Sequence, residues 1–138
     1  MATILQFDQI PRFDRGSEIW SVPLATGEST RDANEFVTGI SSYPVGQGAR
    51  FHCHNCDEQV VVLSGAGKVE VDGIVKMLGR YDGAYIEAGL FHSYRKASDT
   101  EPMVILWIYG SKVVTRTFAD TGETVDHLSA SDLMGSTD

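Results

Sequence analysis

The stretch from Gly46 to Gly65 reads GQGARFHCHNCDEQVVVLSG. Successive side chains of a β-strand point to opposite faces, so His52 and His54 are expected on one face and Cys53 on the other. Two imidazoles held side by side on a rigid strand are a favourable start for a metal site, because their separation is already set. Glu58 follows after a short turn and can add a carboxylate to the same group. The stretch therefore predicts a metal site built on a β-strand.

A further ligand is available later in the chain. His92 opens another predicted strand, after a turn at residues 87–89. Neutral imidazoles with one carboxylate suit Fe(II), Mn, Ni, Cu or Zn, and they leave coordination positions open for a substrate or for oxygen. His92 is therefore the candidate for the fourth ligand.

Outside this stretch the sequence predicts an all-β fold. Its 14 glycines separate short runs rich in Val, Ile, Phe and Tyr, and no long segment keeps a helical apolar pattern. Asp72-Gly73 is the strongest hairpin signal, because both residues of such a turn must take positive φ. Residues 24–34 predict a loop and residues 129–138 a loose tail. The expected strands, which together indicate a sandwich or a barrel, span residues 4–7, 35–43, 49–54, 58–63, 68–71, 74–77, 83–86, 91–95, 104–109 and 113–117.

The spacing of these histidines and glycines resembles the first motif of the cupin superfamily. That motif runs glycine, five residues, His-x-His, three or four residues, Glu, six residues and glycine. Every position of it is met by Gly46, His52, His54, Glu58 and Gly65. The motif is long and specific, and it requires a strand–turn–strand context.

The second cupin motif is matched only in part. Gly89 and His92 stand at expected positions, whereas Tyr81, Glu87 and Lys96 replace the usual glycine, proline and asparagine. The resemblance implies that His92 is a metal ligand. The missing proline implies either a more mobile loop around His92 or, through Glu87, an extra carboxylate near the metal.

The resemblance also implies the fold: an all-β double-stranded β-helix, the cupin jelly-roll barrel, with the metal inside its mouth. We expect one domain in all. An N-terminal strand and loop extension spans residues 1–34, the barrel residues 35–117, and a C-terminal extension with a loose tail residues 118–138. We predict one divalent ion per chain, Fe(II), Mn, Ni or Zn, bound by His52, His54, Glu58 and His92.

Three residues are candidates for catalysis beside the metal. Arg50 lies two residues before His52, so it is expected to face the interior and hold an anionic group of the substrate; a partly exposed arginine at the strand end is the equal alternative. Tyr94 is expected on the ligand face of its own strand. The general base is expected to be Tyr94, Glu87, Glu58 or a metal-bound water.

Aromatic residues are expected to complete the pocket. Trp107 and Tyr109 share one strand face and are expected at the pocket mouth, in the core or at a dimer contact. A mainly apolar pocket with one cationic group suits a small organic acid, phenol or enol. Asp126, His127 and Ser129 are expected to be solvated on a polar tail, which makes them poor candidates for a catalytic group.

Charge and length exclude several classes of function. The 138 residues fit one domain, and 11 Lys and Arg against 19 Asp and Glu give a net charge of −8. That balance argues against nucleic acid or an anionic membrane as partner, since both need clustered positive charge. No apolar run reaches the length of a membrane span and no signal peptide is recognisable, so we expect a cytoplasmic protein.

The resemblance leaves the reaction open, because cupins include oxygenases, isomerases, lyases, cyclases and binding proteins. We predict a metal-dependent enzyme that acts on a small organic molecule, with an oxygenase (dioxygenase) as the first hypothesis. The alternatives are a non-redox isomerase, lyase or cyclase, and a metal-dependent module that binds and senses a small ligand. A homodimer is expected, because residues 4–7 and 103–109 would leave apolar edges or patches exposed on a monomer.

Overall fold

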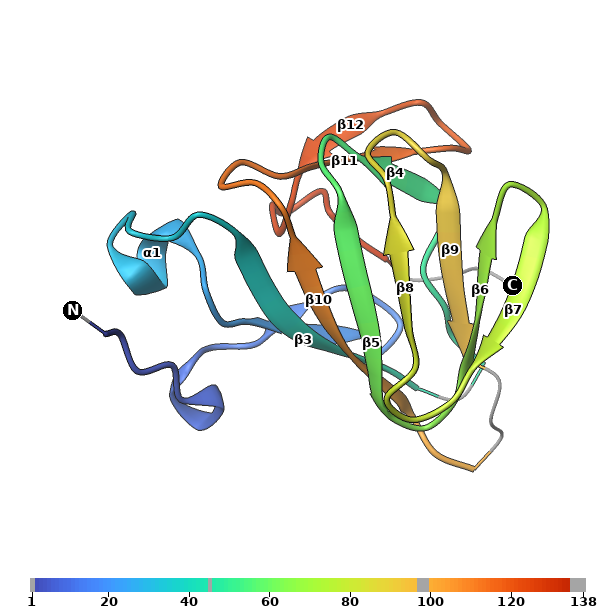
Figure 1. The fold of residues 1–138 in the computed structure, drawn as a ribbon, viewed down its shortest axis with the longest axis horizontal. Helices are drawn as coiled ribbons and strands as arrows, with labels where there is room; N and C mark the ends of the chain where they lie inside the picture. Colours follow the sequence, from blue (N-terminus) through green and yellow to red (C-terminus); the bar gives the residue numbers. More distant parts are fainter. Residues whose placement is uncertain (1, 45, 97–99, 135–138) are drawn as a thin grey trace.

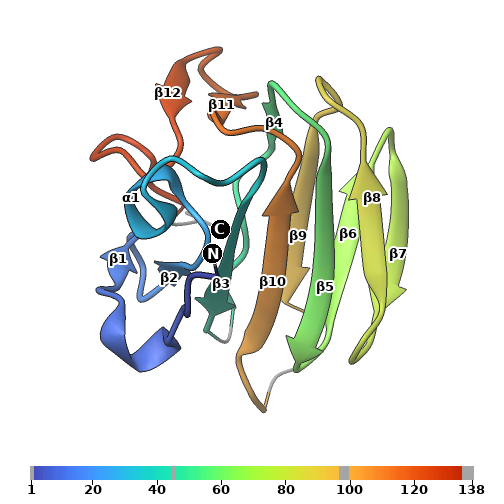
Figure 2. The same ribbon diagram turned by 60° about the vertical axis from the view of Figure 1, so that its left-hand side comes forward.

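The computed structural model describes residues 2–44, 46–96 and 100–134, which form two antiparallel β-sheets that face each other (Figure 1). Figure 2 shows β10, β5 and β8 of one sheet lying in front of β9, β6 and β7 of the other. This arrangement is the jelly-roll barrel that the sequence predicted. The first six-stranded sheet has the order β1 (Phe13–Asp14), β2 (Trp20–Pro23), β3 (Val37–Tyr43), β10 (Met103–Tyr109), β5 (Glu58–Ser64), β8 (Gly83–Ile86). The second has the order β12 (Thr124–Asp126), β11 (Thr115–Phe118), β4 (His52–His54), β9 (His92–Lys96), β6 (Gly67–Val71), β7 (Ile74–Leu78).

The expected strands from residue 35 onward are present, with differences of a few residues at their ends. The predicted hairpin joins β6 to β7. Val71 pairs with Ile74, so Asp72 and Gly73 form the whole loop, with φ of 52° and 75°. Both positive angles are those that a two-residue turn requires.

β10 lies at the centre of the first sheet, between β3 and β5. Alternate side chains of this strand, including Ile105, Trp107 and Tyr109, are buried in the core between the two sheets. Trp107 also donates its indole N–H to Ser41 Oγ at 2.7 Å. The expectation of an exposed apolar edge at residues 103–109 is therefore wrong, because both sides of the strand are paired.

The N-terminal part departs from the prediction. Residues 4–7 are not assigned to a strand: Ile4 is 79% exposed, and a 3₁₀ turn follows at Phe7–Gln9. A strand needs a hydrogen-bonding partner, and no described strand pairs with this segment. The N-terminal extension instead adds β1 and β2 to the first sheet. No local sequence pattern in the extension predicts this pairing.

A short helix, α1 (Gly27–Thr30), lies within the predicted loop at residues 24–34. Thr26 caps it, because its side chain accepts a hydrogen bond from the Ser29 amide at 3.2 Å. Among the described residues no helix has the length and apolar character needed to cross a membrane.

The C-terminal segment is packed against the barrel. β12 pairs with β11, and beyond it Asp132 and Met134 are 2% and 1% exposed. The Met134 amide donates to the Arg15 carbonyl at 2.8 Å, which ties this segment to the N-terminal part of the chain. The expectation of a loose tail is therefore wrong as far as residue 134, because buried ion pairs hold Asp132. Residues 135–138 of that expectation lie outside the described residues.

Gly39 provides a test of this packing. It stands opposite Trp107 in the β3–β10 register, and a Cβ added there would overlap the indole ring. We expect Gly39→Ala to lower the free energy of unfolding in urea by about 3 kcal/mol, because the overlap forces the ring out of its position. The control is Gly79→Ala, whose Cβ would lie 3.5 Å from its nearest neighbour and should cost less than about 1 kcal/mol. Equal losses in the two variants would contradict the packing of Trp107 against β3.

Candidate metal centre

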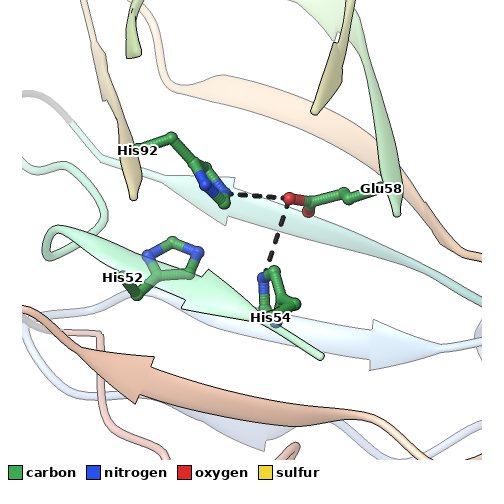
Figure 3. A group of neighbouring side chains, drawn as sticks. All are labelled: His52, His54, Glu58 and His92. Atoms are coloured by element: carbon green, nitrogen blue, oxygen red, sulfur yellow. Dashed lines mark hydrogen bonds and ion pairs between the residues drawn. The ribbon is translucent and has the colours of Figure 1, made fainter. Parts of the chain in front are cut away.

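Three strands from both sheets bring the four predicted ligands together. His52 and His54 lie on β4, His92 begins β9, and Glu58 begins β5 in the opposite sheet. None of the four is more than 4% exposed. One ligand atom from each lies within 4.8 Å of those of the others, and Figure 3 shows the rings and the carboxylate pointing toward one another. The residues singled out in the sequence thus form one buried cluster.

The segments around the cluster are tied together by hydrogen bonds from two backbone amides. The carboxylate of Asp57 accepts from the Ala88 amide at 2.9 Å, and the Gly89 amide donates to the His54 carbonyl at 3.0 Å. These bonds join the turn before Glu58 to the loop before His92. That loop is therefore held in place although it lacks the usual proline.

Each histidine is oriented by the same kind of hydrogen bond. The Nδ1 atoms of His52, His54 and His92 lie 2.5, 3.0 and 2.8 Å from the backbone carbonyl oxygens of Arg50, Thr115 and Leu90. A carbonyl accepts only, so each Nδ1 carries the proton, and in a neutral imidazole the lone pair is then on Nε2. The Nε2 atoms of His92 and His54 lie 3.0 and 3.7 Å from the same Glu58 oxygen.

Electrostatics keep this set of donors ready for a cation. Burial, followed by the charge of Arg116, lowers the pKa of His52 well below its usual value, and burial lowers the pKa of His54 to about 3. Burial alone would raise the pKa of Glu58, but His54 and His92 outweigh it and lower the pKa to about 2. At neutral pH His52 and His54 are therefore neutral and Glu58 is ionised. His54 Nε2 is buried without a hydrogen-bond partner, and a divalent ion bound by all four residues would give it one.

A model of the Cupin domain family matches residues 39–109, which include all four cluster residues and β10. The chain belongs to the cupin family. A search of curated proteins returned no match.

Solved cupin structures have the same fold at low sequence identity. A sugar phosphate isomerase from a cupin superfamily, from Silicibacter pomeroyi, is 21% identical over 89% of this chain and 85% of its own, with a TM-score of 0.71. KdgF from Halomonas sp. is 16% identical over 80% of this chain and 94% of its own, with a TM-score of 0.66. A mutant of Bacillus subtilis oxalate decarboxylase is 17% identical over 83% of this chain, with a TM-score of 0.71; this cupin matches 31% of that longer chain. At these identities the likeness shows the fold.

A small cavity adjoins the cluster inside the barrel. Its volume of about 10 Å³ has room for about one water molecule. The lining is more polar than the sequence predicted, and it consists of Arg15, Ser41, Tyr43, His52, Glu58, Tyr94, Ile105, Trp107, Tyr109 and Arg116. Trp107 and Tyr109 are thus wall residues of the barrel interior.

The three predicted catalytic residues lie in different places. Tyr94 is buried in the cavity wall, with its hydroxyl 3.4 Å from Glu58 Oε1. Glu87 is exposed in the turn after β8 and does not line the cavity. The expected extra carboxylate near the metal is therefore not found at this position.

Arg50 does not point into the cavity. Its guanidinium lies over the Phe118 ring and pairs with the exposed Asp120 at 2.8 Å. The inward orientation expected from alternation is wrong, because β4 begins only at His52 and the two-residue period does not extend back to Arg50. The backbone carbonyl of Arg50 nevertheless orients the His52 ring.

Sequence reasoning missed four polar residues of the interior. Arg15 and Asp132 carry no local signal, since each lies in irregular chain. Arg116 did carry a local signal, because it stands at an inward position of a predicted strand, in phase with Phe118. His127, expected to be solvated, packs edge-on against Trp107 and Tyr109 with ring centroids 4.9 Å apart in both cases.

Metal analysis tests the centre directly. We expect one divalent ion per chain after reconstitution and dialysis, measured by elemental analysis. His54→Ala should weaken binding by roughly 100-fold or more, because it removes a ligand whose Nε2 faces Glu58. Cys53→Ala is the matched control, since that side chain points to the other face of β4. Equal metal in both variants, or none in the reconstituted wild type, would contradict the site.

Proposed function

We propose that this cupin is a metal-dependent enzyme that acts on a small organic molecule. The observation that carries the proposal is the convergence of three imidazole Nε2 atoms and the Glu58 carboxylate in a buried site. Burying four such groups brings no stability to a barrel that serves only as a scaffold. The similar structures of a sugar phosphate isomerase and an oxalate decarboxylase support an enzyme on this fold.

The first candidate reaction is a non-redox one of the isomerase or lyase kind. When bound, a divalent ion would supply Lewis-acid activation of a substrate oxygen. The cavity adds two guanidinium groups, from Arg15 and Arg116, and several tyrosine hydroxyls. Donors of this kind stabilise negative charge as it develops on a substrate oxygen, which suits a reaction through an enol or enolate.

Tyr94 is the residue proposed to move a proton. Burial, and next the charge of Glu58, raise the pKa of Tyr94 well above its usual value, so the hydroxyl keeps its proton at neutral pH. Tyr94 is therefore suited to donate a hydrogen bond or a proton to a substrate oxygen beside Glu58. This assigns it the role of acid, whereas the sequence suggested a base.

The oxygenase predicted from the sequence is the second candidate. Neutral imidazoles with one carboxylate are a donor set that leaves positions for both a substrate and oxygen. The apolar side chains of Ile105 and Trp107 line one side of the cavity, which suits an apolar gas molecule. These two observations support the candidate without reference to any relative.

Turnover with and without oxygen separates the candidates. The metal-loaded protein would be screened against small hydroxy acids, keto acids, diketones and phenols under air and under nitrogen. We expect turnover that persists under nitrogen and is lost in His52→Ala. Turnover that stops under nitrogen would assign the oxygenase instead. Tight binding of one compound with no turnover of any would replace the enzyme by a ligand-binding module.

The role of Tyr94 has its own test. We expect Tyr94→Phe to lower kcat by about 100-fold with little change in KM, because it removes a proton donor and keeps the ring. Tyr81→Phe is the matched control, since Tyr81 is 69% exposed. Equal kcat in wild type and Tyr94→Phe would contradict the assignment.

The homodimer stays a prediction, now on a different surface. Within residues 2–44, 46–96 and 100–134, β7 is an edge strand whose one partner is β6, and its Ile74, Val75 and Met77 are 59%, 52% and 59% exposed. We expect light scattering to give twice the chain mass of 15.1 kDa. Ile74→Lys should shift the protein toward the monomer, whereas Val113→Lys, at another exposed apolar position, should not. A wild-type monomer at micromolar concentration would contradict the dimer.

The remaining partner and location hypotheses also stay predictions. The cytoplasmic location and the lack of nucleic-acid and membrane partners rest on the sequence and its net charge of −8.

A further inference from the structure

Two buried arginines line the same cavity as His52 and Glu58. Arg116 stands opposite His54 in the β11–β4 register, so its side chain enters the barrel on the same face as the ligands. Arg15 follows β1 and reaches the same cavity from the N-terminal part of the chain. Each residue is only 3% exposed. A buried guanidinium requires an anionic partner, so the chain places an anion site next to its metal centre.

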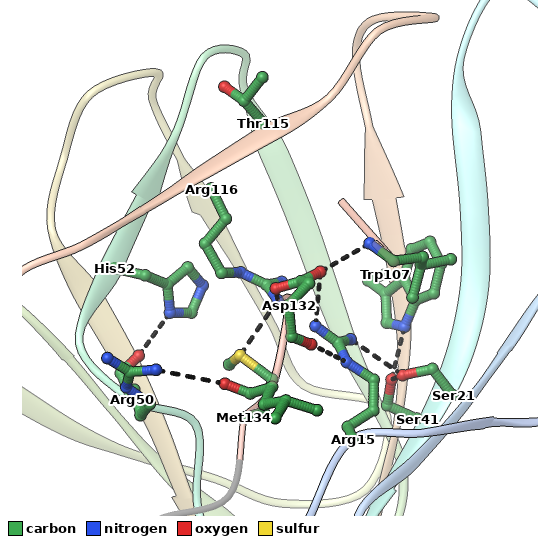
Figure 4. A network of polar contacts seen from close by, with 12 residues as sticks. Arg15, Ser21, Ser41, Arg50, His52, Trp107, Thr115, Arg116, Asp132 and Met134 are labelled. Carbon is green, nitrogen blue, oxygen red and sulfur yellow. Dashed lines mark hydrogen bonds and ion pairs between the residues drawn. The ribbon is translucent and has the colours of Figure 1, made fainter. Parts of the chain in front are cut away.

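The anion in this site is the carboxylate of Asp132 (Figure 4). Arg116 Nη1 lies 2.5 Å from Oδ1, and Arg15 Nη2 lies 2.8 Å from Oδ2, so each guanidinium binds one oxygen. The Leu128 amide donates to Oδ2 at 2.7 Å. Burial alone would raise the pKa of Asp132, but Arg116 and Arg15 outweigh it and keep the pKa below its usual value. The Asp132 carboxylate is therefore held between two guanidinium groups, one on each oxygen.

The anion site contacts the four-residue His/Glu cluster through Tyr109. Arg116 Nη2 donates to the Tyr109 hydroxyl at 3.3 Å, and the Tyr109 ring packs on His54 with centroids 4.6 Å apart. The Nε atom of Arg116 is buried without a hydrogen-bond partner. The guanidinium therefore has one N–H donor left over after Asp132 and Tyr109 are bound.

The charges of the interior favour an anionic ligand once a metal is bound. Arg15 and Arg116 are balanced by Asp132 and Glu58 in the protein alone. A divalent ion adds two positive charges that no buried side chain in this group offsets. Because an uncompensated buried charge is costly, entry of a negatively charged molecule lowers the free energy of the loaded protein.

Asp132 is the anionic member of this group that lies outside both sheets, in a segment of turns and loop. Residues 128–134 form turns and loop, outside both sheets, whereas Arg116 and Glu58 are on paired strands. The cavity has a volume of about 10 Å³, so a substrate larger than water enters only if a side chain moves out. Withdrawal of Asp132 would free both guanidinium groups at once.

We propose that Arg15 and Arg116 form the subsite for a carboxylate group of the substrate, and that Asp132 occupies this subsite until that carboxylate replaces it. This inference rests on the proposed function, because it names the substrate class of the same site. The substrate is a small carboxylic acid whose carboxylate binds the arginines while another oxygen faces the metal cluster.

Rescue of a truncated side chain tests the subsite in the metal-free protein. Asp132→Ala should lower the Tm, because two buried arginines lose their partner. Saturating acetate should then raise the Tm of the variant by roughly 5 °C more than it raises that of the wild type. Acetamide, which has the same shape without the charge, should have no such effect.

Asp120→Ala is the matched control, because Asp120 also pairs with an arginine at 2.8 Å but is exposed. Acetate should leave its Tm unchanged relative to the wild type. An equal acetate effect in both variants, or none in Asp132→Ala, would overturn the subsite.

A second measurement uses the wild type and does not depend on the folding of a variant. Acetate added to the metal-loaded protein should increase hydrogen exchange at the amides of Leu128 and Met134 severalfold, because these bonds hold the segment that carries Asp132. Amides of β10 should keep their protection. Unchanged exchange at Leu128 and Met134 would overturn the displacement of Asp132.

The two proposals fail separately. Acetate rescue in a protein that binds no metal would retain the carboxylate subsite and reject the metal-dependent enzyme. Metal binding without acetate rescue would reject the subsite and leave the enzyme proposal in place.

Discussion

Each histidine of the cluster donates its Nδ1–H to a backbone carbonyl, and the centre depends on this one kind of hydrogen bond. The three carbonyls belong to Arg50, Thr115 and Leu90, which lie on three separate segments of the second sheet and its loops. The tautomer of each ring is therefore set by backbone that only the assembled barrel brings into position. Because these bonds occupy the Nδ1 atoms, Nε2 is the atom of each ring that remains for a cation.

The same constraint explains why the cluster needs two sheets. A strand places two side chains on one face at a fixed separation, which is what β4 does with His52 and His54. A single short strand supplies only two of the four ligands, so the others must come from other strands. Glu58 comes from the opposite sheet, and the turn that returns the chain to it is held by the Asp57 carboxylate and the Ala88 amide. The barrel thus holds four buried groups that could bind a cation within 4.8 Å of one another.

Charge burial governs the rest of the interior. Two arginines inside a small barrel are stable only while an anion is bound between them, and Asp132 supplies that anion from a segment outside the sheets. This single carboxylate joins the N-terminal part, β11 and the C-terminal segment. It accounts for the packing of residues that composition alone would assign to a solvated tail.

The sequence by itself determined those features of the fold and the site that depend on residues close together in the chain. Strand alternation placed His52 and His54 together, the resemblance to the cupin motifs located Glu58 and His92, and Asp72-Gly73 specified a hairpin through positive φ. Only the tertiary structure decided the orientation of Arg50, the central position of β10 and the meeting of Arg15, Arg116 and Asp132. Alternation holds only inside a strand, so it did not apply to Arg50, which lies before β4 begins. Arg15 and Asp132 are 117 residues apart, and no local pattern records a pair whose partners meet only when both sheets have formed.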